Sequence, residues 1–559
     1  MGLGMKFLLP FAFCALLASL LAAQTSTTEV PSKESANCMV EGHVVLEPGG
    51  QPLKKVAIEI FSDYAEANSY STLTDAEGHF KIEDMKPGQY KVRVQRNGYL
   101  QSGKYRGRFH FQPLTLKRSQ ELKDLVFRMQ PAAVITGKIV DPDGDPVLKA
   151  SVHVIRLRLG SSHANRQFYG QEQTNDLGEY RISDLPPGRY LVLAQTWWAS
   201  PAPSAGIENS ASSKNETVYA PTYYPGTMDK TQATAIELHA GDQVPANFAL
   251  VTSRSFRIHG TVSGLPTTAG SGIRIEVRSK VDSDIHYNPS TKIDKDGKFE
   301  IRDVLPGSYM LSFQASGDGR FSQPVSTGQT VEVTNTDVNG LKITPIPKGE
   351  VRGQFREDSG QKVDWSHTAV LLESDEDSDG SNSPHFAEVK SDGSFALKNV
   401  PAGSYHLVVG SGEQTLRDYF VKSVNLGGKD VADTGFTVES ASYSVDMMVS
   451  AKGATIEGTV LDAKDQPVVD AQVVAIPDPA RRKRRDLYKE DSTDQRGHFT
   501  LHGLNPGPYT VIAFDDLDDD YSDPDFLKSY EGRGQNVEIK EGERKTVQLK
   551  VIPWTDEQP

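Results

Sequence analysis

One three-part pattern recurs five times along this chain and constrains its fold more than any other feature. Each copy begins with a short apolar-x-Gly-x-apolar segment. It continues 36 to 41 residues later with a turn glycine before alternating apolar positions, and ends with a Pro/Gly turn and a tyrosine. The turn glycine and the tyrosine are 12 residues apart in every copy. The interval is constant although the residues within it differ between copies, which indicates one structural unit repeated along the chain.

The three parts of the pattern predict strands and tight turns. An acidic residue and a glycine before an alternating apolar run predict a β-hairpin, because glycine takes the positive φ that the turn requires. Apolar positions two and four residues after the tyrosine predict a strand with one buried face. We therefore expect these residues to build the fold and not a catalytic set. The opening glycines are Gly42, Gly137, Gly260, Gly353 and Gly458; the turn glycines are Gly78, Gly178, Gly297, Gly393 and Gly497; the tyrosines are Tyr90, Tyr190, Tyr309, Tyr405 and Tyr509.

Composition agrees with many short strands. The 559 residues include 48 Gly and 32 Pro, and 37% are apolar, which is a turn-rich balance that disfavours an all-α fold. The formal net charge of −14 argues against nucleic acid as a partner.

The first 23 residues have the pattern of a secretory signal peptide. The apolar run 7–21 is followed by Ala22 and Ala23, small residues that suit cleavage. The run is short and contains Pro10, and no later stretch reaches the roughly 18 apolar residues of a membrane span. We expect a secreted chain, in the periplasm, at the cell surface or outside the cell, with no transmembrane span after cleavage. Cys38 would be its one thiol, so no internal disulfide is expected.

The order of the motifs resembles the carboxypeptidase regulatory-like family. The shared features are the G-x-V strand, an early proline turn such as Asp145-Pro146 or Gln466-Pro467, the T-D-x-x-G-x-F hairpin and the L-x-P-G-x-Y turn. The resemblance covers nearly all of the chain that remains after signal-peptide cleavage, although the third and fourth copies lack the early proline turn. It implies transthyretin-like or starch-binding-like β-sandwich modules, and it looks like the tandem versions in secreted proteins of acidobacteria.

We therefore predict an all-β chain of five tandem antiparallel β-sandwich modules, transthyretin-like or immunoglobulin-like, after a cleaved signal peptide. Short connections between copies predict a semi-rigid rod of modules. The predicted divisions are a signal peptide at 1–23, a linker at 24–38, and modules at 39–130, 131–252, 253–347, 348–452 and 453–559, the second carrying an aromatic loop at 196–230.

The aromatic loop of the second module is the predicted recognition site. Flat rings in a long loop suit stacking on sugar faces, so the loop predicts carbohydrate binding. The alternative is that the loop folds back and covers its own sheet. The rings are those of Trp197, Trp198, Tyr219, Tyr223 and Tyr224.

Two acidic runs are candidate calcium sites, since oxygen clusters on loops suit a hard cation. The first begins like an EF-hand loop, but its twelfth position is Phe386 where a bidentate glutamate is needed. The alternative for both runs is a solvated negative loop. No other cofactor is predicted. The carboxylates are Asp375, Asp377 and Asp379 in the first run and Asp515, Asp516, Asp518, Asp519 and Asp520 in the second.

Catalytic motifs are scarce. The sequence has no G-x-S-x-G elbow, P-loop or H-E-x-x-H motif. One H-x-x-E pair, His385 and Glu388, has the spacing of two zinc ligands in a carboxypeptidase, a spacing expected about once by chance. The basic run 481–485 predicts an exposed, protease-sensitive loop, or a partner for the acidic loop or for an anionic polymer.

These features favour a secreted, non-catalytic, multi-domain binding protein over an enzyme. The first hypothesis is that the chain binds carbohydrate or another cell-envelope polymer. The second is a structural or adhesive spacer, or a protein-interaction scaffold, at the cell surface. The third, an accessory chain of a peptidase, depends on the family resemblance and the His385/Glu388 pair alone.

Overall fold

The computed structural model is built almost entirely of β-strands. α1 (Pro524–Lys528) is the one α-helix among the described residues, and three short 3-10 turns are η1 (Lys230–Gln232), η4 (Pro479–Arg481) and η5 (Arg485–Leu487). The described residues are 37–62, 69–102, 111–157, 168–196, 217–263, 273–282, 285, 289–315, 324–344, 349–360, 363, 365, 368–374, 385–411, 417–515, 521, 524–530 and 532–553.

The strands form five successive sandwiches, each built from two packed sheets around its own apolar core. This confirms the all-β, tandem β-sandwich fold class. In the first sandwich the sheets have the orders β4-β1-β8-β6 and β3-β2-β5-β7. Its strands are β1 (Cys38–Leu46), β2 (Ala57–Ser62), β3 (Ser69–Leu73), β4 (His79–Met85), β5 (Gly88–Gln95), β6 (Tyr99–Gln101), β7 (Gln112–Leu116) and β8 (Glu121–Pro131).

The second and third sandwiches repeat this plan. In the second, β11-β10-β13-β15 faces β12-β9-β17, and in the third, β22-β21-β24-β25 faces β23-β20-β26. The strands of the second are β9 (Ala133–Val140), β10 (Ser151–Leu157), β11 (Phe168–Gln173), β12 (Glu179–Leu185), β13 (Gly188–Gln195), β14 (Thr217–Tyr219), β15 (Thr222–Tyr223), β16 (Ile236–Leu238), β17 (Gln243–Pro245), β18 (Phe248–Ala249) and β19 (Thr252–Arg254). Those of the third are β20 (Phe256–Val262), β21 (Ile273–Ser279), β22 (Ser290–Lys292), β23 (Lys298–Val304), β24 (Gly307–Ala315), β25 (Pro324–Val333) and β26 (Val338–Ile343).

The fourth sandwich has the sheets β30-β27-β35-β32-β33 and β29-β28-β31-β34, and in the fifth the two sheets join through a short β40–β42 pairing. The strands of the fourth are β27 (Gly349–Glu357), β28 (Thr368–Ser374), β29 (His385–Glu388), β30 (Ser394–Val400), β31 (Gly403–Ser411), β32 (Phe420–Leu426), β33 (Lys429–Asp430), β34 (Phe436–Val438) and β35 (Ser442–Ser450). Those of the fifth are β36 (Ala454–Leu461), β37 (Gln472–Pro477), β38 (Lys489–Ser492), β39 (His498–Leu504), β40 (Gly507–Phe514), β41 (Gln535–Ile539) and β42 (Arg544–Ile552).

Each sandwich adds parallel pairing to the expected antiparallel pattern. The strand with the opening glycine lies beside a strand from the end of the same repeat, as in β1 with β8, β20 with β26, β27 with β35 and β36 with β42. In the second sandwich, β9 pairs in the same way with β17 and β18. A strand from the end of each repeat therefore lies beside its first strand.

The parallel pairing explains the opening glycines. A Cβ on Gly42 would lie closer than 3.0 Å to the carbonyl oxygen of Leu125 on β8, a separation that real Cβ atoms essentially never show. A Cβ on Gly458 would meet the carbonyl of Val547 on β42 in the same way. The glycines are thus required by close approach of the neighbouring backbone, not by an unusual φ.

The turn glycines adopt the conformation that the sequence predicted. Their φ angles lie between 72° and 82°, in the left-handed region. In four sandwiches an Asp or Asn three residues earlier fixes the turn, since its side-chain oxygen accepts two backbone N–H groups, as Asp75 does from Glu77 and His79. The other three are Asn175, Asp294 and Asp494.

The repeat tyrosines are buried, and four of them cap the turn before their strand. The hydroxyl of Tyr190 donates to the carbonyl of Pro186, four residues earlier, at 2.7 Å. Tyr90, Tyr309 and Tyr405 make the same contact. The hydroxyl of Tyr509 is buried with no hydrogen-bond partner among the described residues.

This difference predicts unequal effects of removing the two hydroxyls. We expect Tyr190→Phe to destabilise the chain by about 1 kcal/mol, since it leaves a buried carbonyl without a donor. We expect Tyr509→Phe to be neutral or slightly stabilising, because it removes a buried polar group that makes no hydrogen bond. Urea denaturation of the two variants measures both values, and equal losses of stability would contradict the assignment.

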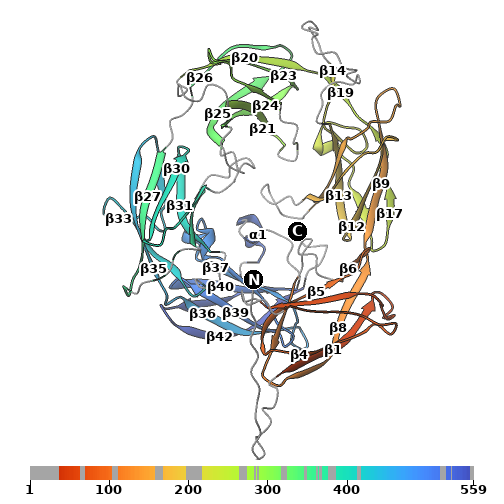
Figure 1. Ribbon diagram of the computed structural model, residues 1–559, viewed down its shortest axis with the longest axis vertical. Helices are drawn as coiled ribbons and strands as arrows, with labels where there is room; N and C mark the ends of the chain where they lie inside the picture. The colour runs from red at the N-terminus through yellow and green to blue at the C-terminus, as the bar shows by residue number, and fades with distance from the viewer. Residues whose placement is uncertain are drawn as a thin grey trace, which may run out of the picture.

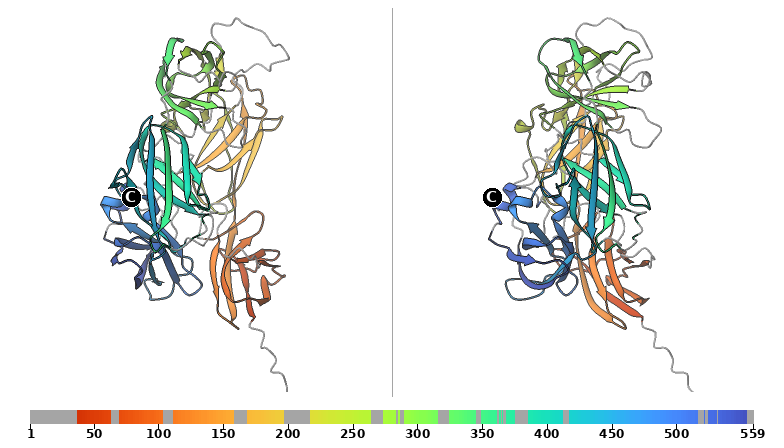
Figure 2. Two further views of the ribbon diagram at one scale, coloured as in Figure 1. Left: turned by 60° about the vertical axis from the view of Figure 1, so that its left-hand side comes forward. Right: turned by 90° about the vertical axis from the view of Figure 1, so that its left-hand side faces the viewer.

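The five sandwiches follow one another around a ring, not along the expected rod (Figure 1). The two further views show that the first and fifth sandwiches lie at the same end of the molecule (Figure 2). They meet at Gln495, whose side-chain amide accepts from the N–H of Thr115 at 3.1 Å and donates to its carbonyl at 2.6 Å. Because Thr115 is on β7, the edge strand of its sheet, this amide covers backbone groups that no strand pairs.

Candidate functional site

The predicted aromatic site is only partly described. Trp197 and Trp198 lie outside the described residues. Tyr219 and Tyr223 are buried, at 5% and 0% exposure, and Tyr224 packs partly buried against the core of the second sandwich. Tyr219 and Tyr223 therefore do not offer open ring faces, whereas Tyr224 is partly exposed, and carbohydrate binding by this loop stays a prediction.

Tyr223 instead joins two sandwiches. Its hydroxyl donates to Asp282 of the third sandwich at 2.6 Å, and both side chains are buried. Beside it, Val218 and Ala220 pack against Leu305 of the third sandwich. A buried hydroxyl–carboxylate bond over an apolar contact fixes the orientation of the two neighbours.

The predicted calcium ligands remain untested. Asp375, Asp377, Asp379, Asp516, Asp518, Asp519 and Asp520 lie outside the described residues. Asp515 is described, and its N–H donates to the carbonyl of Ile552. Within the described parts of the chain, no group of three or more His, Cys, Asp or Glu side chains is placed to hold a metal ion.

The side chains of the candidate zinc pair do not converge on one point. His385 and Glu388 lie on the single edge strand β29. Residues three apart on a strand point to opposite faces, so the two side chains cannot ligate one ion from this strand.

The basic run 481–485 is not the exposed loop that the sequence predicted. Arg484 is 1% exposed and lies where the fourth and fifth sandwiches meet. Its guanidinium donates to Asp486 at 3.1 and 2.6 Å and to Asp433, in the fourth sandwich, at 2.8 Å. Arg481 donates to the same Asp433 oxygen at 3.3 Å. Lys483 is exposed.

The charge of Asp433 is maintained by these arginines. Burial acts to raise the pKa of this carboxyl, but hydrogen bonds and charge from Arg484 and Arg481 hold it below its ordinary value. A buried arginine paired on both sides is strongly dependent on each partner, because an isolated buried charge is costly.

A second set of contacts fixes the same two sandwiches from another side. His502 on β39 contacts Asp418 at 3.0 Å, and Lys422 on β32 contacts Glu541 at 3.2 Å. The side chain of Asn505 is buried and donates to the carbonyl of Val421 at 2.8 Å. Polar contacts therefore join the fourth and fifth sandwiches at two places.

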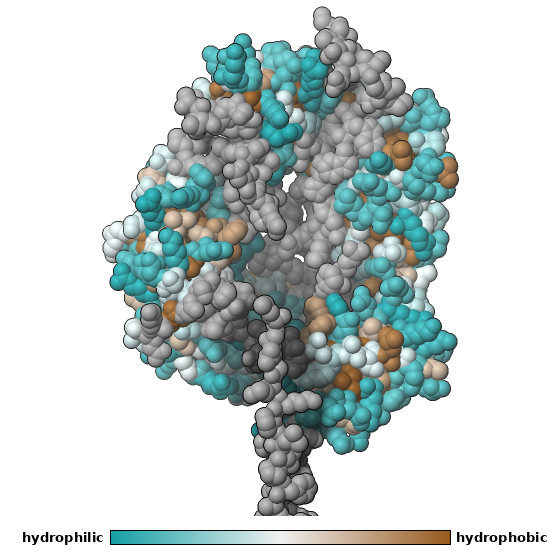
Figure 3. Space-filling model, viewed as in Figure 1, coloured by the Kyte–Doolittle hydropathy of each residue, from teal (hydrophilic) through white to brown (hydrophobic). Residues whose placement is uncertain are grey.

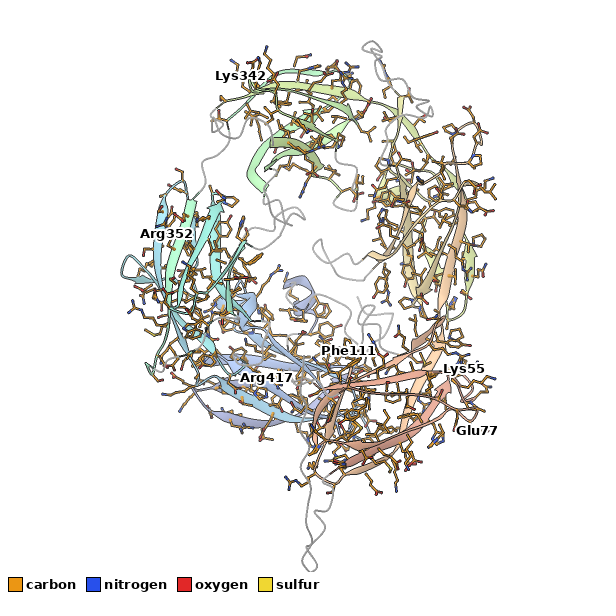
Figure 4. The ribbon with its side chains drawn as sticks, viewed as in Figure 1. Lys55, Glu77, Phe111, Lys342, Arg352 and Arg417 are labelled. Carbon is orange, nitrogen blue, oxygen red and sulfur yellow. The ribbon has the colours of Figure 1, made fainter. Side chains whose placement is uncertain are left out.

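Asp491, on β38, is a carboxyl near this contact whose pKa is strongly raised. Burial raises its pKa to about 6, while Arg417 and backbone N–H groups oppose the shift. Arg417 lies where the fourth and fifth sandwiches meet (Figure 4). One oxygen of Asp491 accepts the N–H of Thr500 at 2.6 Å.

The shift of Asp491 predicts a pH-dependent gain from Asp491→Asn. Because the folded chain binds this proton more tightly, the carboxyl destabilises the fold increasingly as pH rises from about 4 to about 6. We expect Asn, which still accepts from Thr500, to add about 2 kcal/mol above pH 6 and nothing near pH 4. Urea denaturation at both pH values tests this, and an equal effect at both would contradict it.

A cavity of about 620 Å³ opens beside η4 in the fifth sandwich. Its volume is in the range that suits a small molecule. None of the predicted sugar-stacking or calcium-binding residues lines it, but Arg482 of the basic run 481–485 does. The lining residues are Ile476, Asp478, Pro479, Arg482, Pro508, Tyr509, Thr510, Ile512, Leu527, Gly532, Asn536, Val537 and Glu538.

The junction residues were missed by the sequence analysis. Asp433, Asp282 and Glu541 stand in segments without any motif, and their partners lie 51, 59 and 119 residues away. The one available signal was Arg481–Arg485 itself, since five consecutive basic residues need a reason to persist in an acidic chain.

Family models match three parts of the chain. The carboxypeptidase regulatory-like domain matches residues 39–129 and 455–550. The β-sandwich domain of ER membrane protein complex subunit 7 matches residues 360–456. Each match falls on described sandwiches.

Curated relatives cover part of the chain. Over 278 residues it is 27% identical to the BOS complex subunit NOMO1 of Mus musculus, covering 46% of this chain and 21% of that protein. Over 90 residues it is 30% identical to the BOS complex subunit NOMO3 of Homo sapiens, covering 16% and 7%. The aligned regions thus span about a fifth or less of these relatives.

Two solved structures match the chain at low sequence identity and low TM-score. A streptococcal ancillary pilin is 15% identical, with a TM-score of 0.18, over 56% of this chain and 100% of that chain. The Bacillus anthracis TIE protein is 12% identical, with a TM-score of 0.16, over 76% of both chains.

In the described parts of this chain, no helix has the length and apolarity to cross a membrane.

Proposed function

Because this chain carries carboxypeptidase regulatory-like domains in its first and last sandwiches, we propose that it is a non-catalytic scaffold that holds five β-sandwich domains in a fixed arrangement for partner proteins. The curated relatives are named as complex subunits, which supports this class of function. We also propose export to the periplasm or cell surface, since the first 23 residues have the pattern of a signal peptide.

The buried Arg484 junction is the observation that carries the proposal. A freely moving string of domains needs no buried polar contacts between neighbours. Here a fully buried arginine and a buried tyrosine–aspartate bond join consecutive sandwiches, so the chain's best-defined polar contacts fix domain geometry.

The exposed surface is of the kind that forms non-obligate protein interfaces, which form and dissociate. The visible face is mainly hydrophilic, with hydrophobic residues in small, separate patches (Figure 3). Such surfaces suit polar, non-obligate interfaces better than permanent apolar ones. Among the described residues, the large exposed hydrophobic ones are Leu73, Val126, Leu148, Leu177, Met228, Val281, Phe386 and Val469.

Co-purification from the envelope fraction tests the scaffold. We expect the tagged chain to retain a defined set of proteins, and Arg484→Ala to lose those that depend on the fourth and fifth sandwiches. Lys483→Ala, an exposed neighbour, should retain all of them. A chain without reproducible partners would contradict the proposal.

Carbohydrate binding is the second candidate, supported by Trp197 and Trp198 and by the fold resemblance. Two adjacent indoles suit stacking on sugar rings. A polysaccharide pull-down with the double variant Trp197→Ala/Trp198→Ala tests it. Binding that is lost in the double variant supports this site, and binding that persists removes it. No observation favours an accessory role to a peptidase.

A further inference from the structure

Glu373 of the fourth sandwich faces the buried arginine junction. It lies on β28, directly opposite His406 on β31. The charged groups around it are Arg484, Arg485 and Asp486 from the fifth sandwich and His406 from its own sheet. His406 is 2% exposed, and its Nε2 lies 3.3 Å from the carbonyl oxygen of Asp433.

One carboxyl oxygen of Glu373 is left without a partner. Its Oε2 is buried and makes no hydrogen bond to any described residue. Three of the five N–H groups of Arg484 donate to Asp486 and Asp433, and neither of the other two makes a hydrogen bond to this oxygen. An ionised carboxylate in this position is costly, and the negative charge of Asp486 makes it more so.

We propose that a proton on Glu373 completes this junction, so that the fifth sandwich docks most tightly on the fourth at acidic pH and loosens as the pH rises. The inference rests on the proposed scaffold function, since it adds regulation to the contact that fixes the geometry. A protonated carboxyl is neutral, which removes the repulsion from Asp486.

The directions of the pKa shifts of Glu373 and Asp433 support tighter docking at low pH. Burial, with Asp486 adding to it, raises the pKa of Glu373, against the opposing effects of Arg485, His406 and Arg484. A raised folded-state pKa means that stabilisation is present at low pH and is lost as pH rises through that pKa. Asp433 has a lowered pKa, so its contribution is lost only in stronger acid.

Hydrogen exchange of the full chain tests the proposal at the junction itself. The N–H groups of Arg484, Leu487 and Tyr488 are bonded within the η4–η5 segment, so their protection reports docking. After correction for intrinsic exchange, we expect the wild-type protection to be higher at about pH 4, below the ordinary pKa of a glutamate, than at about pH 8. In Glu373→Gln and Glu373→Leu it should be independent of pH.

The matched control is Glu388→Gln, an exposed carboxyl on the neighbouring strand β29, which should behave as wild type. Wild-type protection that does not change with pH, or that changes equally in Glu373→Gln, overturns the proposal while leaving the scaffold intact. Absence of protection at every pH in every variant would contradict the docking, and with it the proposed function.

Discussion

Arg484→Ala is expected to destabilise the chain by about 3 kcal/mol, the lower end of the cost of breaking a buried ion pair, because the Asp433 side chain is half-exposed. The substitution leaves Asp433 and Asp486 facing each other without the guanidinium that bonds both. Chemical denaturation followed by intrinsic fluorescence measures the loss. We expect it to appear as an earlier transition of the fifth sandwich, since that sandwich carries the arginine.

The neighbouring Lys483→Ala is the control for this prediction. It removes the same kind of charge from the same basic run, but the side chain is exposed. A change within about 0.5 kcal/mol is expected for such a surface position. Equal effects of the two substitutions would show that the run acts through its overall charge and not through the buried bridge.

Gly42→Ala is expected to cost about 3 kcal/mol or more, at the upper end of what overpacking a core usually costs. The added methyl group would overlap the carbonyl and Cβ of Leu125, which are backbone and near-backbone atoms that cannot rotate away. Relief requires β1 and β8 to separate, and these two strands begin and end the first sandwich. Thermal and urea denaturation measure the loss.

Gly50→Ala in the same sandwich is the matched control. Gly50 has a φ of +68° and no atom within 4 Å of an added Cβ, so its substitution costs conformational strain alone. That strain is about 1–2 kcal/mol for an alanine in the left-handed region. If Gly42→Ala were no more harmful than Gly50→Ala, close strand approach would not be the reason for the repeated glycine.

The repeat made the fold predictable, because its signals are local. A turn glycine such as Gly78 and a tyrosine such as Tyr90 act within a few residues of themselves, so their spacing carries the hairpin and the capped turn directly. The parallel pairing of β1 with β8 was missed, since it joins the two ends of a repeat. The glycine that permits it was recognised, but its physical reason was not.

The contacts between sandwiches were not predictable from one sequence. Arg484 and Asp433 have no shared motif, and only folding brings the turn between β33 and β34 against the η4–η5 segment. The basic run therefore looked like a solvated loop. In the same way, Tyr223 was interpreted as part of an exposed aromatic loop, whereas its hydroxyl donates a hydrogen bond to Asp282 of the next sandwich.

Small-angle X-ray scattering of the purified chain tests most directly whether these junctions impose one arrangement. Five domains of about 100 residues placed end to end would extend to about 170 Å. The account predicts a much shorter maximum dimension and a scattering profile that matches the ring, in which Gln495 reaches Thr115. A profile of an extended, flexible string of five domains would contradict it.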